Sequence, residues 1–298
     1  MTDTRKAHLA LFIVNLVYGI NYSVAKDVMP EYIQPFGFIL IRVVSATVLF
    51  WIFQFILGAN EKVARKDFLT IALAGVFGIA ANQLLFFKGL SMTTPINASI
   101  VMTTTPVIVL IIASLWVRQI PERQKILGVF FGISGALMLL TFRAGSFAFP
   151  DFSQQTVTGD VLVLTNATAF SIYLVIVKPI MKRYKPITVI KWAFLFGSFY
   201  VFPFGYQEFR IIDWSSITPL IWGEIAFVVL ATTFLVYLLN VYGLKRLNPE
   251  TVSVYIYLQP FFASMVALAL GKDSLTWIKL VSVSLVFIGV YLVSFKKS

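Results

Sequence analysis

Long apolar runs, separated by short charged or turn-rich segments, follow one another along the whole chain. Ten of these runs approach the roughly 20 residues that a helix needs to cross about 30 Å of hydrocarbon. Lipid supplies no water to bare backbone groups, and the alternating pattern of barrel strands is absent, so we expect helices. The expected spans are residues 8–28, 36–57, 68–87, 95–116, 126–142, 161–181, 188–204, 222–241, 251–270 and 277–295.

Composition agrees with a chain that lies mostly in lipid. Of its 298 residues, 59% are hydrophobic and 12% are charged, with a mean hydropathy of +0.87. Soluble domains carry roughly 45–50% apolar and about 25% charged residues. Too little polar material exists to cover a water-facing surface, so we predict an all-α integral membrane protein.

The positive charges are unevenly distributed between the two sides of the expected bundle. With the N-terminus inside, the cytoplasmic segments hold 16 of the 24 lysines and arginines and the outer segments hold 6. Cytoplasmic loops of membrane proteins carry such an excess. We therefore expect both termini to be cytoplasmic and the protein to lie in the cytoplasmic (inner) membrane, and we interpret the net charge of +11 as a property of this membrane face, not as a site for nucleic acid.

Groups that carry chemistry are scarce. The chain has no cysteine and one histidine, His8, which excludes disulfides and leaves no material for a thiolate or imidazole metal site. Acidic residues avoid the span centres, so no paired carboxylates are expected in a cavity. We predict no cofactor, no metal and no enzymatic activity.

The two halves of the sequence resemble each other at a shift of 154 residues. From residue 89 to 135 the shift gives nine identities in 47 positions, where this composition would give roughly three or four by chance. The matches include glycines and prolines, on which membrane helices can also converge independently. The clearest pairs are Gly89-Leu90 with Gly243-Leu244, Pro95 with Pro249, Ser99 with Ser253, Pro106 with Pro260, and Gly135 with Gly289.

A repeat of five spans places the second copy in the membrane from the opposite side, because five is odd. Inverted repeats of this kind are associated with alternating-access transporters that bind substrate near the bilayer midplane. We expect the first repeat to comprise residues 1–145 and the second to comprise residues 146–298.

Each half carries the pattern Gly-Leu-x4-Pro-x3-Ser-x6-Pro, followed by a short loop and a final helix that contains glycine. In this the chain resembles the EamA-type members of the drug/metabolite transporter superfamily along essentially its whole length. The resemblance implies ten helices, cytoplasmic termini and, usually, export of small metabolites. Relatives often carry Gly-Glu at the end of the fourth and ninth helices, whereas this chain reads Val117-Arg118 and Gly271-Lys272, so no role of that glutamate is carried over.

Two prolines lie inside the fourth and ninth spans. Pro106 and Pro260 lack an N–H and clash with the carbonyls of Met102 and Ile256, so each helix should kink or loosen there. We predict that both act as hinges. The alternative is that they serve packing, as prolines in membrane helices often do.

Polar side chains deep in a span are costly and usually face a cavity or a neighbouring helix. Arg42 either snorkels to the outer interface or points inward and holds a carboxylate or phosphate with its planar fork. The other polar groups either line a cavity or bond helices together. Asn15, Tyr22, Asn82, Asn166 and Asn240 are polar residues of this kind that we leave unassigned. The residues that we predict to bind substrate are Tyr18, Asn21, Arg42, Gln83, Tyr173, Tyr237 and Gln259.

The function predicted from the sequence is secondary transport, with export expected, of small polar metabolites such as amino acids. The expected partners are a small-molecule substrate and the lipid bilayer. The alternative is a channel or facilitative pore for small solutes, although no charge ring or carbonyl filter is recognisable.

Overall fold

The computed structural model describes residues 3–58, 61–93, 95–143, 146–147, 154–269 and 276–294, and nearly all of them are helical. Up to residue 143 the helices are α1 (Asp3–Val28), α2 (Pro35–Ile56), the 3₁₀ turn η1 (Arg65–Asp67), α3 (Phe68–Gly75), the π-helical turn η2 (Val76–Ala80), α4 (Ala81–Met92), α5 (Pro95–Met102), α6 (Thr105–Val117) and α7 (Arg123–Thr141). From residue 154 they are α8 (Gln154–Arg183), α9 (Pro186–Arg210), α10 (Pro219–Val229), the π-helical turn η3 (Leu230–Leu235), α11 (Val236–Arg246), α12 (Pro249–Val254), the 3₁₀ turn η4 (Tyr255–Tyr257), α13 (Leu258–Ala269) and α14 (Trp277–Ser294). Between them, β1 (Phe142–Arg143) and β2 (Ser146–Phe147) pair in antiparallel fashion, a small departure from the all-α expectation.

Seven helical stretches in the described part of the chain are long and apolar enough to cross a membrane. They are Asp3–Val28, Pro35–Ile56, Arg65–Met92, Asn97–Val117, Gln155–Arg183, Pro186–Arg210 and Pro219–Arg246. The other three expected spans fall on α7, on α12 with α13, and on α14. Several helices extend past the expected bounds, since polar residues continue a helix beyond its apolar segment.

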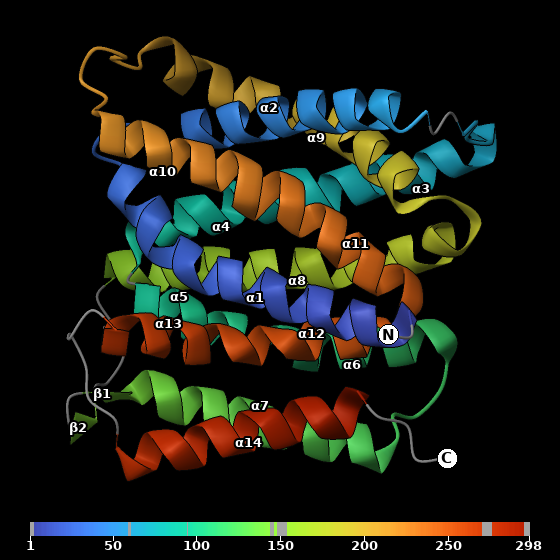
Figure 1. Ribbon diagram of the computed structural model, residues 1–298, viewed down its shortest axis with the longest axis vertical. Coiled ribbons are helices and arrows are strands. Elements are labelled where there is room, and N and C mark those ends of the chain that lie inside the picture. The colour runs from blue at the N-terminus through green and yellow to red at the C-terminus, as the bar shows by residue number, and fades with distance from the viewer. Residues whose placement is uncertain are drawn as a thin grey trace.

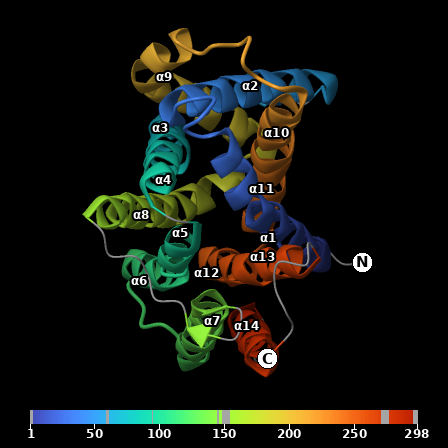
Figure 2. The same cartoon turned by 90° about the vertical axis from the view of Figure 1, so that its left-hand side faces the viewer.

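The helices run side by side in a stack, with α2 and α9 at one end and α7 and α14 at the other (Figures 1 and 2). The carboxylate of Glu208, at the end of α9, accepts the backbone N–H groups of Phe36 and Gly37 at the start of α2, at 2.6 and 2.9 Å. This satisfies two N–H groups that a helix start leaves without partners. The beginning of α1 and the end of α14 lie on the same side of the stack, at the right in Figure 1.

Glycines bring α7 and α14 into close contact. A Cβ atom added to Gly289 would lie 2.6 Å from the carbonyl oxygen of Gly128, and one added to Gly135 would lie 2.5 Å from that of Ser282. The 154-residue shift relates Gly135 to Gly289 and Gly128 to Ser282. The same close contact between small residues is therefore made twice, with the two helices exchanged.

Two π-helical turns interrupt the third and eighth expected spans. η2 begins at Val76 and η3 begins at Leu230, which are again 154 residues apart. The sequence predicts uninterrupted helices over 68–87 and 222–241, because a single wide turn does not alter the apolar pattern.

The helix is distorted just before each of the two span prolines. A turn at Thr103 and Thr104 separates α5 from α6 ahead of Pro106, and the 3₁₀ turn η4 separates α12 from α13 ahead of Pro260. The missing N–H and the proline ring account for both interruptions. The predicted distortions are therefore present at both positions.

Two lysines bind the carbonyl ends of equivalent helices. Lys26 Nζ donates to the carbonyl oxygens of Leu90 and Thr93, at 2.9 and 3.2 Å, just where α4 ends. Lys178 Nζ donates to the carbonyl oxygens of Leu244, at 2.5 Å, and Leu247, at the end of α11. Each ammonium group satisfies carbonyls that a helix end leaves free and meets the negative end of the helix dipole.

Candidate functional site

A cavity lies in the middle of the bundle, between helices of both halves. The space inside it that holds the centres of water molecules is about 80 Å³, and roughly 10–15 Å³ of such space accommodates one water. It can therefore contain several waters or one small polar ligand. Its walls consist of Leu11, Val14, Asn15, Tyr18, Asn21 and Tyr22 from α1, Arg42 from α2, Asn82, Gln83, Phe86 and Phe87 from α4, Met102 from α5, Asn166 and Phe170 from α8, Tyr237 and Asn240 from α11, and Val252, Ile256 and Gln259 from α12 to α13.

Six of the seven predicted binding residues line this cavity. They are Tyr18, Asn21, Arg42, Gln83, Tyr237 and Gln259. The two prolines do not line it, but Met102 and Ile256, which lie four residues before them, are both in its wall.

Tyr173 is the exception, and the structure places it behind the wall. Its ring stacks on Phe170 with the centroids 5.9 Å apart and packs against Gly78, where an added Cβ atom would lie 2.3 Å from the ring. Its side chain is 3% exposed. The polar character of Tyr173 suggested a cavity position, whereas in the structure its ring contacts Gly78 and Phe170 and is not part of the cavity lining.

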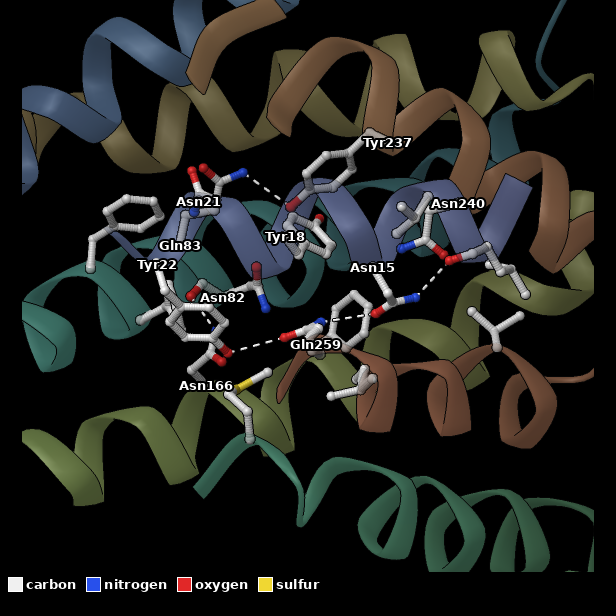
Figure 3. A pocket seen from close by; sticks show the side chains of 18 of the residues that line it. Asn15, Tyr18, Asn21, Tyr22, Asn82, Gln83, Asn166, Tyr237, Asn240 and Gln259 are labelled. Carbon is white, nitrogen blue, oxygen red and sulfur yellow. Dashed lines mark hydrogen bonds between the residues drawn. The ribbon is translucent and has the colours of Figure 1, made fainter. Parts of the chain in front are cut away.

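Gln83 and Tyr237 form the centre of one hydrogen-bonded chain. Gln83 Nε2 donates to the Tyr237 hydroxyl, and that hydroxyl donates to the carbonyl oxygen of Gly78, both at 3.0 Å. Both side chains are buried. Figure 3 shows the first of these bonds across the cavity wall.

A second chain connects the polar stripe of α1 to α13. Tyr22 donates its hydroxyl proton to Gln259 Oε1 at 3.1 Å, and Gln259 Nε2 donates to Asn15 Oδ1 at 2.9 Å (Figure 3). Asn15 Nδ2 donates in turn to the carbonyl oxygen of Leu11 at 2.8 Å. The spacing of Asn15, Tyr18 and Tyr22 along α1 puts them on one face of the helix, which is the face toward the cavity.

Arg42 points inward and does not snorkel. Its side chain is 3% exposed, Nε donates to Thr233 Oγ1, and Nη2 lies 3.3 Å from the carbonyl oxygen of Thr232. The guanidinium carbon lies 4.7 Å from the centre of the Phe87 ring. Among the described residues no carboxylate pairs with it, so a buried positive charge borders the cavity without an acidic partner.

Several amide oxygens of the cavity residues are also without a partner. Among the described residues, Asn21 Oδ1, Gln83 Oε1, Asn166 Oδ1 and Asn240 Oδ1 are buried and accept no hydrogen bond. A buried polar atom left this way costs about 1–3 kcal/mol. The cavity therefore combines one cation with several acceptors that water or a bound donor can satisfy.

The sequence left part of this wall unassigned. Asn15, Tyr22, Asn82, Asn166 and Asn240 all line the cavity, as do two aromatic residues that no pattern singled out, Phe86 and Phe87. Helical spacing was the available signal, because residues three and four positions after Gln83 share its face.

A bundle of apolar helices around a buried polar cavity is the arrangement expected of a membrane transporter. The chain belongs to the EamA-like transporter family, whose sequence profile matches residues 5–141 and 157–295. The two matched segments also establish that the chain contains two EamA domains.

Two of three relatives that align along most of the chain are named as transporters. The "Uncharacterized transporter YyaM" of Bacillus subtilis (strain 168) is 25% identical, with 89% of this chain and 87% of that protein aligned. An "Uncharacterized transporter" of Archaeoglobus fulgidus is 24% identical over 98% of both chains. The "WAT1-related protein At3g53210" of Arabidopsis thaliana is 23% identical, covering 99% of this chain and 87% of its own.

A solved structure, titled only "Crystal structure of protein", has the same fold. It superposes with a TM-score of 0.73 over 96% of this chain and 95% of that chain, at 16% sequence identity. This likeness extends to the fold alone.

Proposed function

We propose that this protein is a secondary transporter that exports small polar metabolites, such as amino acids, across the cytoplasmic membrane by alternating access. Arg42 supplies the single observation that carries the proposal. It is a buried cation on the wall of the cavity, with no carboxylate partner among the described residues. A substrate carboxylate supplies the missing charge, and the guanidinium fork matches its geometry.

The unpaired amide oxygens support a substrate that also carries donors. A carboxylate bound to Arg42 leaves the opposite end of a zwitterion among the amides of Asn21, Gln83, Asn166 and Asn240. An ammonium group has three N–H donors and no acceptor, which suits a set of free oxygens. An α-amino acid therefore fits the polarity of the cavity better than a sugar or a cation.

The twice-repeated features support alternating access. The two π-helical turns, the two lysine-capped helix ends and the two proline interruptions occur at matching positions in both halves. Ten spans in two inverted halves, with both termini cytoplasmic, allow one half to rock against the other around a fixed site. In this scheme Pro106 and Pro260 are the hinges.

Reconstitution into liposomes tests the proposal. Vesicles loaded with a mixture of unlabelled L-amino acids should accumulate radiolabelled L-amino acids by exchange, with saturation and with preference over the D forms. Current or flux that does not saturate indicates the channel alternative. Absence of exchange for every member of the mixture overturns the assignment of amino acids.

A thermal-shift screen on the purified protein gives a second, independent test. A ligand that binds only the native state raises the melting temperature. Amino acids that exchange in vesicles should raise it, and their methyl esters, which lack the carboxylate, should not.

A further inference from the structure

The two π-helical turns present carbonyl oxygens at equivalent positions to residues that line the cavity. In η2 the carbonyl oxygen of Gly78 accepts from the Tyr237 hydroxyl at 3.0 Å. In η3 the carbonyl oxygen of Thr232 accepts from Arg42 Nη2 at 3.3 Å. Gly78 and Thr232 are 154 residues apart, so each half uses the equivalent carbonyl to hold a cavity residue of the other half.

The geometry of a π-helical turn explains why these carbonyls are available. An extra residue widens the turn, hydrogen bonds reach back five residues where an α-helix reaches four, and a carbonyl loses its usual partner. A buried carbonyl needs a donor from elsewhere. Side chains that border the cavity, Tyr237 and Arg42, supply it.

In η3 two threonine hydroxyls, beside the carbonyl of Thr232, are further hydrogen-bond acceptors for Arg42. Thr232 Oγ1 and Thr233 Oγ1 both donate to the carbonyl oxygen of Val228, at 2.7 and 2.8 Å. A hydroxyl has one proton and two lone pairs. Since each proton is already directed to Val228, both oxygens can only accept from Arg42.

Arg42 meets these acceptors along one edge of its guanidinium group. Nε donates to Thr233 Oγ1, and Nη2 lies 3.4 Å from Thr232 Oγ1. Nη1 makes no hydrogen bond to any residue in the described ranges. The face of the group lies against the Phe87 ring, so one edge is bound, the plane is held and the other edge stays open.

We propose that η3 is the positioning element of the substrate site, in which Thr232 and Thr233 orient Arg42 so that its open edge meets a substrate carboxylate. Both threonines are 0% exposed and neither lines the cavity, so they act through Arg42 and do not touch the substrate. The inference rests on the proposed function, because it takes the ligand of Arg42 to be a carboxylate.

Substitution of Thr233 separates positioning from packing. Thr233→Val keeps the shape and removes the acceptor of Nε, whereas Thr233→Ser keeps the hydroxyl. Thr47→Val is the matched control, since Thr47 is also a buried threonine, lies on α2 with Arg42, and within the described part of the chain bonds only to Val43 and Ser198.

The first measurement is the rate of hydrogen exchange at the Arg42 Nε–H group. NMR on full-length protein labelled with ¹⁵N-arginine measures this rate. Loss of one signal in Arg42→Lys identifies the signal of this group. We expect slow exchange in the wild type, in Thr233→Ser and in Thr47→Val, and exchange at least about tenfold faster in Thr233→Val, because a charge-assisted hydrogen bond in a buried site is lost. Unchanged exchange in Thr233→Val overturns the proposal.

The second measurement is exchange transport in proteoliposomes, with a radiolabelled mixture of L-amino acids as the probe. Thr233→Val should raise the half-saturating concentration about tenfold, the equivalent of one lost contact of about 1.4 kcal/mol, while Thr233→Ser and Thr47→Val stay within about twofold of the wild type. Methyl esters of the same amino acids should inhibit uptake of the labelled amino acids only weakly in the wild type. Relative to the free amino acids, they should inhibit uptake by Thr233→Val more strongly than uptake by the wild type.

The possible failures are distinguishable. If Arg42 Nε–H exchange accelerates in Thr233→Val while its half-saturating concentration and ester discrimination stay at wild-type values, Thr233 holds Arg42 but does not position it for substrate, and the proposal is overturned. If the wild type transports no amino acid, the proposed function fails in its substrate class, and the NMR comparison still decides whether η3 orients Arg42.

Discussion

Gln83 and Tyr237 occupy equivalent positions in the two halves of the sequence and are hydrogen-bonded to each other. Gln83 Nε2, on α4 of the first half, donates to the Tyr237 hydroxyl, on α11 of the second half, at 3.0 Å. The same hydroxyl donates a hydrogen bond to the carbonyl oxygen of Gly78 in η2. One bond therefore connects the polar centre of the cavity with the π-helical turn behind it.

Replacing Gln83 should impair transport without unfolding the protein. Gln83→Leu removes both the donor to Tyr237 and a free amide oxygen of the cavity, and we expect transport to fall about tenfold or more while the melting temperature changes little. Exchange flux in proteoliposomes and thermal unfolding measure the two effects. Gln124→Leu is the control, because Gln124 also donates its amide to a carbonyl, that of Leu292, away from the cavity. Normal flux in Gln83→Leu would remove Gln83 from the site.

Gly78 should tolerate no side chain. A Cβ atom at this position would lie 2.3 Å from the Tyr173 ring, and overpacking of this kind costs about 1–3 kcal/mol. We expect Gly78→Ala to lower the melting temperature by several degrees. Gly223→Ala should be neutral or slightly stabilising, since nothing lies within 4 Å of its Cβ position and alanine favours a helix. Equal melting temperatures for the two variants would argue against the close packing of Tyr173 on η2.

Lys178 should stabilise the end of α11. Lys178→Met keeps the length of the side chain and removes the ammonium group from the carbonyls of Leu244 and Leu247, which we expect to cost about 1–2 kcal/mol. Thermal unfolding in detergent measures the loss. Lys182→Met, one turn further along α8 at an exposed position, should change stability by less than about 0.5 kcal/mol.

The orientation in the membrane is open to a direct test because the chain contains no cysteine. Single cysteines at Lys182, in the last turn of α8, and at Ser215, between α9 and α10, should differ in reactivity toward an impermeant thiol reagent. Labelling of intact cells should modify the cysteine at Ser215 and spare the one at Lys182. The opposite pattern would place the termini outside.

The hydropathy of the sequence determined the membrane class and the location of the helices. Apolar runs such as residues 36–57 and 188–204 require a helix in lipid whatever their neighbours are, because each helix satisfies its own backbone. The spacing of Asn15, Tyr18 and Tyr22 likewise determined a polar face on α1, since helical periodicity is local. Pro106 and Pro260 marked the distorted turns for the same reason: the missing N–H is a property of the residue itself.

Only the tertiary structure decided which polar residues meet. Tyr173 and Tyr237 are alike in the sequence, yet Tyr237 lines the cavity and Tyr173 packs on Gly78, because the rotation of each helix depends on the neighbours that it contacts. The π-helical turns at Val76–Ala80 and Leu230–Leu235 were invisible in the sequence, since one extra residue in a turn leaves the apolar pattern unchanged while it redirects a carbonyl. The inward direction of Arg42 follows from Thr232 and Thr233, which lie 190 and 191 residues away along the chain, and no local pattern could bring them together.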